Sequence, residues 1–340
     1  GTTAVVAWQI VETPGAVIDE IGPGATVTPI PGETAVIPIE RGDSPETIGE
    51  RLEEAGVINS SLHFRILISL LGYDQLLQAG LYEFDPGTPT LTAVQRIRSG
   101  QISPLQAVVP EGLRREEVAA ILAGQGVIPA QEFLAAATTT TPYDFDFLAG
   151  LPMGTPLEGY LFPATYSFGR DTDADGVVEA FLTAFDQNLS LALRQEAAEA
   201  GLSLHTVVTI ASIVEREARV SEERPVIAQV FLKRLRLGQP LEADPTVQYA
   251  VANDPANVER FGHWKQGLTQ ADLSVDSPYN TYLNSGLPPG PIANPGLDAI
   301  EAVIRPADTN YLFFVAKPDG SHAFAETLEE HLENIDRYGR

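Results

Sequence analysis

Residues 206–249 decide the fold, and they read TVVTIASIVEREARVSEERPVIAQVFLKRLRLGQPLEADPTVQY. Apolar residues recur at helical spacing in the first part, so the pattern predicts an amphipathic helix with one buried face. A second helix is predicted to follow a cap at Ser221 and to end at Gly238, before a polar turn over 242–246. The buried face of the first helix is predicted to comprise Val207, Ile210, Ala211, Val214 and Ala218.

Two glutamates lie near the end of the first predicted helix. At about 100° per residue, Glu215 and Glu217 fall on the two flanks of the buried face. Partial desolvation of a carboxylic acid at such a margin favours its protonated form, which suits proton donation near neutral pH. In the alternative, which the pattern alone favours, both are solvated helix-end charges paired with Arg216 and Arg219. The pattern does not rank Glu215 against Glu217.

Composition excludes several classes of function. The chain has 340 residues, and its 46 acidic against 21 basic residues give a net charge of −25. Such a charge repels phosphate backbones, so we expect no nucleic-acid partner. There is no cysteine, and the five histidines show no H-x-x-H or H-E-x-x-H spacing. We therefore expect no metal site and no cofactor.

The amino end has a composition of its own. The apolar run over 4–11, AVVAWQIV, is too short to span a bilayer, which needs about 20 residues, and no Lys or Arg precedes Arg41. This is the pattern of a chain that begins within or just after a membrane anchor; an ordinary first strand is the alternative. Residues 12–33 are rich in Pro, Gly and Thr and are predicted to be a linker.

A small module follows the linker. Its strand and helix patterns follow the order strand, helix, helix, strand, helix. The order resembles that of the LysM type of small carbohydrate-binding domain. The predicted elements are a strand AVIPIE (35–40), a helix from 43–45 to a stop at 56, a helix over 62–71, a strand over 79–85 and a helix over 90–99.

An internal repeat links this module to the next part of the chain. Residues 36–58 align without gaps with 106–128, so that Gly42 matches Gly112 and Leu52 matches Leu122. Both a duplication and shared folding rules explain such a match.

The remaining chain predicts further mixed structure. Aromatics at spacing two in 157–168, LEGYLFPATYSF, predict a strand whose rings lie in the core, with sugar stacking by Tyr160 and Tyr166 as the alternative. A Pro- and Gly-rich loop over 277–296 suits either carbohydrate recognition or closure over the core. The other predicted elements are a helix over 177–200, a short helix over 299–304, a hairpin over 309–325 and an acidic helix over 327–337.

Five sequence blocks follow one another along the chain: ASIVEREA (211–218), ERPVIAQVFLKRL (223–235), LEADPTVQYA (241–250), SPYNTYLNSGLPPGPIANPG (277–296) and NYLFFVAKPDGSHAF (310–324). In this order they resemble the signature blocks of one family, the YceG-like endolytic murein transglycosylases. The resemblance implies an α+β fold: a juxtamembrane or linker segment (1–33), a LysM-like βααβ module (34–103) and a larger mixed α+β catalytic domain with a glycan-binding cleft (104–340).

The resemblance places the catalytic glutamate at Glu215, as acid and then base in forming a 1,6-anhydro product. We expect Glu215 to line an open cleft facing the 277–296 loop, and Glu217 to be its salt-bridging or orienting neighbour. The predicted substrate-binding residues are Glu158, Tyr160, Ser212, Glu217, Asp244, Thr246, Tyr279, Asn280, Thr281 and Tyr282.

The resemblance also implies a location and partners. The expected location is the cell membrane, with a single-pass amino-terminal anchor mostly absent from this chain and the catalytic domain outside the cytoplasm. The expected partners are peptidoglycan glycan strands, and peptidoglycan synthases are further candidates. Two other functions stay open: a glycan hydrolase that pairs Glu215 with Asp244, and a non-catalytic peptidoglycan-binding scaffold.

Overall fold

The computed structural model describes residues 34–100, 104–170 and 172–338. The predicted linker and anchor remnant over 1–33 lie outside the described residues. Contacts between Cα atoms divide the chain into unit 1, residues 1–105 with 167–171, and unit 2, residues 106–166 with 172–340. The predicted border between residues 103 and 104 differs from this division by two residues.

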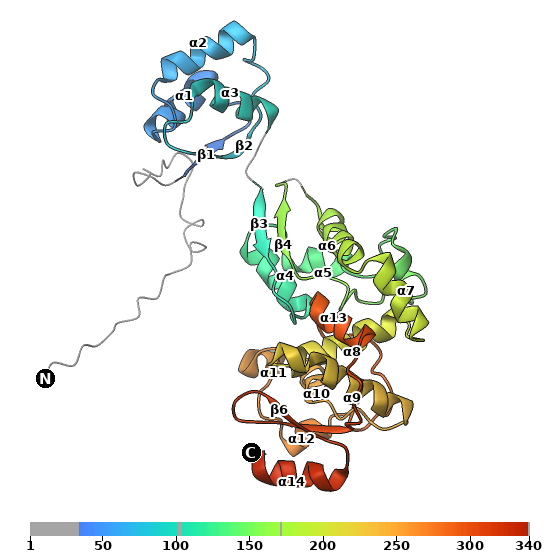
Figure 1. The fold of residues 1–340 in the computed structure, drawn as a ribbon. Helices are drawn as coiled ribbons and strands as arrows, with labels where there is room; N and C mark the ends of the chain where they lie inside the picture. Colours follow the sequence, from blue (N-terminus) through green and yellow to red (C-terminus); the bar gives the residue numbers. More distant parts are fainter. Residues whose placement is uncertain (1–33, 101–103, 171, 339–340) are drawn as a thin grey trace, which may run out of the picture. The chain divides into compact units, whose positions relative to one another are not determined.

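Unit 1 contains the strand–helix–helix–strand order that the sequence predicts (Figure 1). Its two strands are antiparallel, with Ala35 opposite Phe84 and Ile39 opposite Gly80. Alternate residues of the first strand are buried because successive side chains point to opposite faces. The elements are β1 (Ala35–Ile39), α1 (Pro45–Glu54), α2 (Ser61–Leu71), β2 (Gly80–Phe84) and α3 (Thr90–Ser99).

The repeat has a structural counterpart in the next elements, β3 (Leu105–Val108), α4 (Arg115–Gly124), α5 (Ala130–Ala136) and β4 (Thr165–Phe168). The bounds of α4 are those of α1 shifted by 70 residues. The turns before both helices need a glycine, because Gly42 and Gly112 have φ angles of 95° and 75°. The strands β3 and β4 pair with each other, as β1 pairs with β2.

The rest of unit 2 contains one buried helix, α8 (Leu204–Glu217), in which residues 207–214 are all buried. The helices α7, α9, α10 and α13 contact it. The elements are η3 (Asp146–Leu148), α6 (Ala174–Asn188), α7 (Leu191–Glu199), η4 (Ser221–Glu223), α9 (Arg224–Arg236), α10 (Asp244–Val251), α11 (Pro255–Phe261), α12 (Gln270–Leu273), α13 (Leu297–Ile304), β5 (Phe313–Ala316), β6 (His322–Ala325) and α14 (Leu328–Tyr338).

Unit 2 corrects three predictions. The strand predicted over 157–168 is confined to 165–168, and the helix predicted over 177–200 is two helices. Ser190 separates them, because its side chain accepts the Leu193 N–H and caps α7. The predicted turn over 242–246 is the start of α10. The predicted hairpin is confirmed as antiparallel β5 and β6.

Within the described residues, no single helix is long and apolar enough to cross a membrane. The helices α7 and α8 meet the length and composition criteria only as a pair, bent by 96°.

Candidate active site

The sequence positions two carboxylates where α8 leaves the core. Ser203 caps its first turn by accepting the Thr206 N–H, and its buried residues 207–214 anchor the helix. Ala218 then turns to an extended backbone. Glu215 and Glu217 therefore lie in the last turn, as the periodicity predicts.

Both carboxylate oxygens of Glu215 are engaged. Arg224 Nη2 donates to Oε1 and the Gly296 N–H donates to Oε2, each at 3.2 Å. The side chain of Glu215 is only 8% exposed. Glu215 thus faces the end of the 277–296 loop, as expected, but the structure shows an ion-paired carboxylate instead of the predicted open position.

Arg224 is shared among carboxylates. Besides Glu215, it lies 3.5 Å from Asp298 Oδ2 and 3.9 Å from Glu111 Oε2. The side chains of Glu111 and Asp298 are 49% and 74% exposed, against 12% for Arg224. Burial, and then the negative charge of Glu215, raise the pKa of Glu111, while Arg224 opposes that rise.

Two glycines allow this packing. A Cβ added at Gly296 would lie 2.1 Å from the Glu111 carboxyl group, so the close approach requires glycine. A Cβ added at Gly112 would lie 3.4 Å from Glu215 Cγ and 3.2 Å from Arg216 Nη1. Arg216 is held elsewhere, because its Nη1 donates to the Gly112 carbonyl and its guanidinium lies 3.8 Å from the Trp264 ring centre.

Glu217 has a different environment. Burial, and then the charge of Asp244, raise the pKa of Glu217 to about 8. Within the described residues Glu217 makes no ion pair, which corrects the prediction of a salt-bridging neighbour. Its charged neighbour is a carboxylate, so the neutral form is favoured. Tyr282 lies next to Asp244 and donates its hydroxyl hydrogen to Asp244 Oδ1 at 2.7 Å.

Three predicted substrate-binding residues make buried hydrogen bonds that hold the 277–296 loop in place. Asn280, Thr281 and Thr246 are buried. The Thr281 hydroxyl accepts the Ala243 N–H at 3.0 Å and lies 2.8 Å from Thr246 Oγ1. Asn280 Nδ2 donates to two backbone carbonyls. These groups are thus paired in the interior, where they hold the loop, and their part in substrate binding stays a prediction.

Tyr160 and Ser212 are also interior. The Tyr160 ring is 2% exposed and lies 5.4 Å from the Phe185 ring, so it has no free face for a sugar. Ser212 Oγ donates to the Thr209 carbonyl and accepts the Ile292 N–H. Both side chains thus have partners inside the protein, and their part in substrate binding stays a prediction.

Glu158 belongs to a buried polar network around Asn294. Asn294 Oδ1 accepts the Gly159 and Leu161 N–H groups, and its Nδ2 donates to the Leu113 carbonyl. The same Nδ2 donates to Glu158 Oε1 at 3.0 Å. Burial is the main cause that raises the pKa of Glu158 to about 8, and the charge of Glu116 adds to it. Glu158 thus has partners inside the protein, and its part in substrate binding stays a prediction.

Among the predicted substrate-binding residues, Glu217, Asp244, Tyr279 and Tyr282 keep exposed surface. Tyr279 lies against Tyr249, with ring centres 4.7 Å apart. Glu111 and Arg224, which lie beside Glu215, are not among the predicted site residues. A signal for Glu111 exists in the repeat, where an acidic residue stands in the second copy opposite Arg41 in the first.

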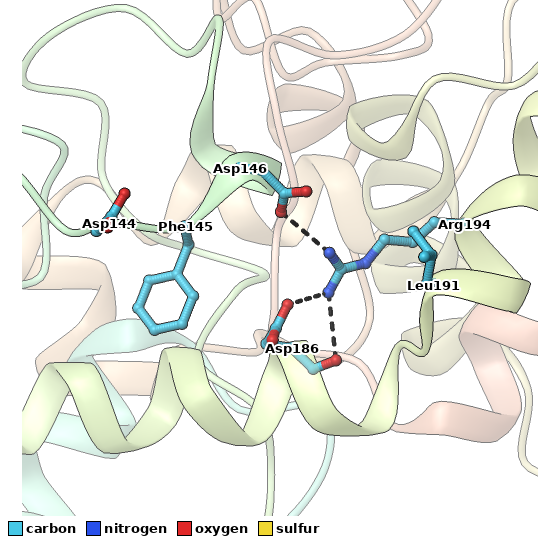
Figure 2. A pocket seen from close by; sticks show the side chains of 6 residues that line it. All are labelled: Asp144, Phe145, Asp146, Asp186, Leu191 and Arg194. Atoms are coloured by element: carbon cyan, nitrogen blue, oxygen red, sulfur yellow. Dashed lines mark hydrogen bonds and ion pairs between the residues drawn. The ribbon is translucent and has the colours of Figure 1, made fainter.

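Two pockets are lined by other residues. Figure 2 shows one of about 510 Å³, in which Arg194 pairs with Asp146 at 3.1 Å and with Asp186 at 2.5 Å. Another, of about 420 Å³, lies in unit 1 and is lined by α1, α2 and nearby residues. Neither is lined by Glu215 or Glu217, so the predicted glycan cleft is not identified with either pocket. The described residues include no group of three or more His, Asp or Glu side chains arranged so that they could hold a metal ion.

Comparison with known proteins places the chain in a family. Residues 37–337 match the YceG-like family. An endolytic murein transglycosylase of Bacillus subtilis is 33% identical over 317 residues, covering 90% of this chain and 85% of that protein. One from Streptococcus pneumoniae is 30% identical over 321 residues, which cover 87% of this chain and 57% of that longer protein.

A solved structure agrees with this match. The crystal structure of a yceG-like protein from Listeria monocytogenes has a TM-score of 0.60 and 34% sequence identity, and the match covers 88% of this chain and 98% of that one. The chain therefore belongs to the YceG-like family.

Proposed function

We propose that this chain is an endolytic murein lytic transglycosylase in which Glu215 is the acid and then the base. The observation that supports this most directly is the placement of Glu215. It ends a helix anchored in the core, and its two oxygens are oriented by Arg224 and the Gly296 N–H. The similarity to proteins named endolytic murein transglycosylases supports the same reaction.

The proposed reaction needs one carboxyl group. Protonated Glu215 donates to the oxygen between N-acetylmuramic acid and N-acetylglucosamine, and the glycosidic bond breaks. The resulting carboxylate accepts the proton of the muramoyl 6-hydroxyl as that oxygen attacks C1, which closes a 1,6-anhydro ring without consuming water. Arg224 and the Gly296 N–H stabilise the carboxylate form, because hydrogen bonds to a carboxylate favour its charged state.

The exposed side chains of the predicted site fit substrate binding. Tyr279 and Tyr282 offer ring faces on which the apolar face of a sugar stacks, and their hydroxyl groups offer hydrogen bonds. Asp244 is exposed and accepts from Tyr282, which fixes that ring. We assign these three residues and Glu217 to the substrate-binding surface.

The remaining features of the proposal concern location. We propose that the βααβ module of unit 1 is LysM-like, and that it either binds glycan or spaces the catalytic domain from the membrane. A pull-down of glycan strands with residues 34–340 and with 104–340 decides between these roles, since only a glycan-binding module lets the longer chain retain extra strands.

An amino-terminal single-pass anchor would hold the protein at the cell membrane with the catalytic domain outside the cytoplasm, beside peptidoglycan synthases.

Cleavage of purified, uncrosslinked glycan strands tests the reaction. The wild type should give fragments ending in 1,6-anhydro-N-acetylmuramic acid, one water lighter than hydrolysis products, and Glu215→Gln should give none. Glu222→Gln, which removes an exposed charge close by in the chain, is the matched control and should cleave normally. Reducing-end products would favour a hydrolase, and no products from the wild type would favour a binding scaffold.

The hydrolase alternative would pair Glu215 with Asp244. In the structure Asp244 accepts from Tyr282 and influences Glu217, while Glu215 interacts with Arg224 and Gly296. The two carboxylates thus have different partners, and product analysis decides between the two reactions.

A further inference from the structure

We propose that Glu111 is a positioning residue which lets Glu215 take up a proton by competing with it for the Arg224 guanidinium. The inference rests on the proposed function, because it concerns how the acid form of Glu215 arises. It starts from a difficulty: an acid must be protonated before it can donate, yet Glu215 is ion-paired with a cation.

The geometry offers Arg224 another acceptor. Arg224 Nη2, the atom that bonds to Glu215 Oε1 at 3.2 Å, also lies 3.9 Å from Glu111 Oε2. A small rotation of the guanidinium toward Glu111 would shorten one contact and lengthen the other. Asp298 holds the opposite nitrogen, Nη1, at 3.5 Å, and so keeps Arg224 near both glutamates.

Glu111 lies close to Glu215. Its carboxyl group lies over Gly296, the residue whose N–H binds Glu215 Oε2. Burial and the charge of Glu215 raise the pKa of Glu111, as expected for two carboxylates that share one cation.

The charges that face this cluster come from three helices. They are Glu215 and Arg216 of α8, Arg224 of α9 and Asp298 of α13. Arg216 donates to the Gly112 carbonyl and contacts Trp264, so Arg224 is the cation bonded to the carboxylates. Three carboxylates around one bonded guanidinium leave an excess of negative charge, which favours uptake of a proton by one of the carboxylates.

The test measures kcat/KM for strand cleavage against pH. Glu111→Gln removes the competitor and one negative charge, so Glu215 should stay ionised to lower pH. The alkaline limb of the profile should move to lower pH by about one unit. At a pH on that limb, kcat/KM should therefore fall by about tenfold. The variant should regain activity at lower pH. Glu111→Asp keeps the negative charge, so its profile should be shifted less than that of Glu111→Gln.

A second variant should shift the profile the other way. Arg224→Gln removes the cation that stabilises the carboxylate, so the alkaline limb should move to higher pH. Glu132→Gln, which removes an exposed charge on α5, is the matched control and should keep the wild-type profile. Thermal unfolding checks that each variant is folded; if Arg224→Gln is not, Arg224→Lys replaces it.

The outcomes separate this inference from the proposed function. If Glu215→Gln is inactive and Glu111→Gln keeps the wild-type limb, the inference is wrong and the function stands. A uniform loss of activity without a shift would assign Glu111 a purely structural role and would also overturn it. If Glu215→Gln still cleaves strands, the proposed function itself is wrong.

Discussion

Replacing Glu158 by glutamine should change how the stability of unit 2 depends on pH. Burial raises the pKa of Glu158 from 4.5 to about 8, so near neutral pH the folded protein holds a proton there that the unfolded chain has released. A carboxyl group whose pKa is raised in the folded state stabilises the fold fully at pH values below its pKa in the unfolded chain. This stabilisation is lost as the pH rises toward the pKa of the folded state. The stability of the wild type should therefore fall between about pH 4.5 and about pH 8.

The size of the effect follows from the shift. Each pH unit in this window costs about 1.4 kcal/mol when the folded state alone is protonated. Glu158 is 4% exposed, so solvent screens it little. The amide introduced by Glu158→Gln has no proton to lose, and its oxygen could still accept the Arg115 and Asn294 N–H groups. Relative to the wild type, the variant should gain about 3–4 kcal/mol between about pH 5 and about pH 8.

Urea unfolding at several pH values, followed by tryptophan fluorescence, measures this difference. The raised pKa of Glu217 contributes a slope of its own, but that slope is common to both proteins and cancels in the comparison. Parallel stability–pH curves for the wild type and Glu158→Gln would refute the reasoning, because they would show that Glu158 is ionised in the folded state.

Three further substitutions test other parts of the structure. Phe64→Ala removes a fully buried ring from unit 1 and should lower the free energy of unfolding of that unit by about 3–5 kcal/mol; an unchanged urea midpoint would contradict this packing. Tyr282→Phe removes the 2.7 Å hydrogen bond to Asp244 and should raise KM by about three- to tenfold with little change in kcat, whereas a loss confined to kcat would argue against a binding role. Gly296→Ala should displace the Glu111 carboxyl group, which a Cβ would approach to 2.1 Å, and so reproduce the pH shift of Glu111→Gln; a wild-type profile would show that the carboxyl group is free to adapt.

The secondary structure was predictable where local signals act alone. The helix over Thr90–Ser99 has the predicted bounds, because a proline precedes it and Gly100 ends it in a left-handed conformation. The turn between β5 and β6 follows from Pro318-Asp319-Gly320. The break between α6 and α7 was missed because Leu189 and Leu193, on either side of it, are both buried and continue the apolar pattern.

The candidate site was predictable only in part. Periodicity places Glu215 and Glu217 at the helix end, and the family resemblance chooses between them. The resemblance does not show that Glu111, Arg224 and Gly296 surround Glu215. Glu111 and Gly296 lie far from Glu215 in the chain, and Arg224 reaches it from the next helix, nine residues on. The loop residues Asn280 and Thr281 look available for sugars by type, but the backbone groups they satisfy become visible only in the folded chain.

Cleavage in water enriched in heavy oxygen tests the central claim most directly. If Glu215 closes a 1,6-anhydro ring, no heavy oxygen enters the muramoyl ends, and mass spectrometry of the products should show unlabelled anhydro termini that are absent with Glu215→Gln. Labelled reducing ends from the wild type, or unlabelled anhydro ends that persist in Glu215→Gln, would contradict the account.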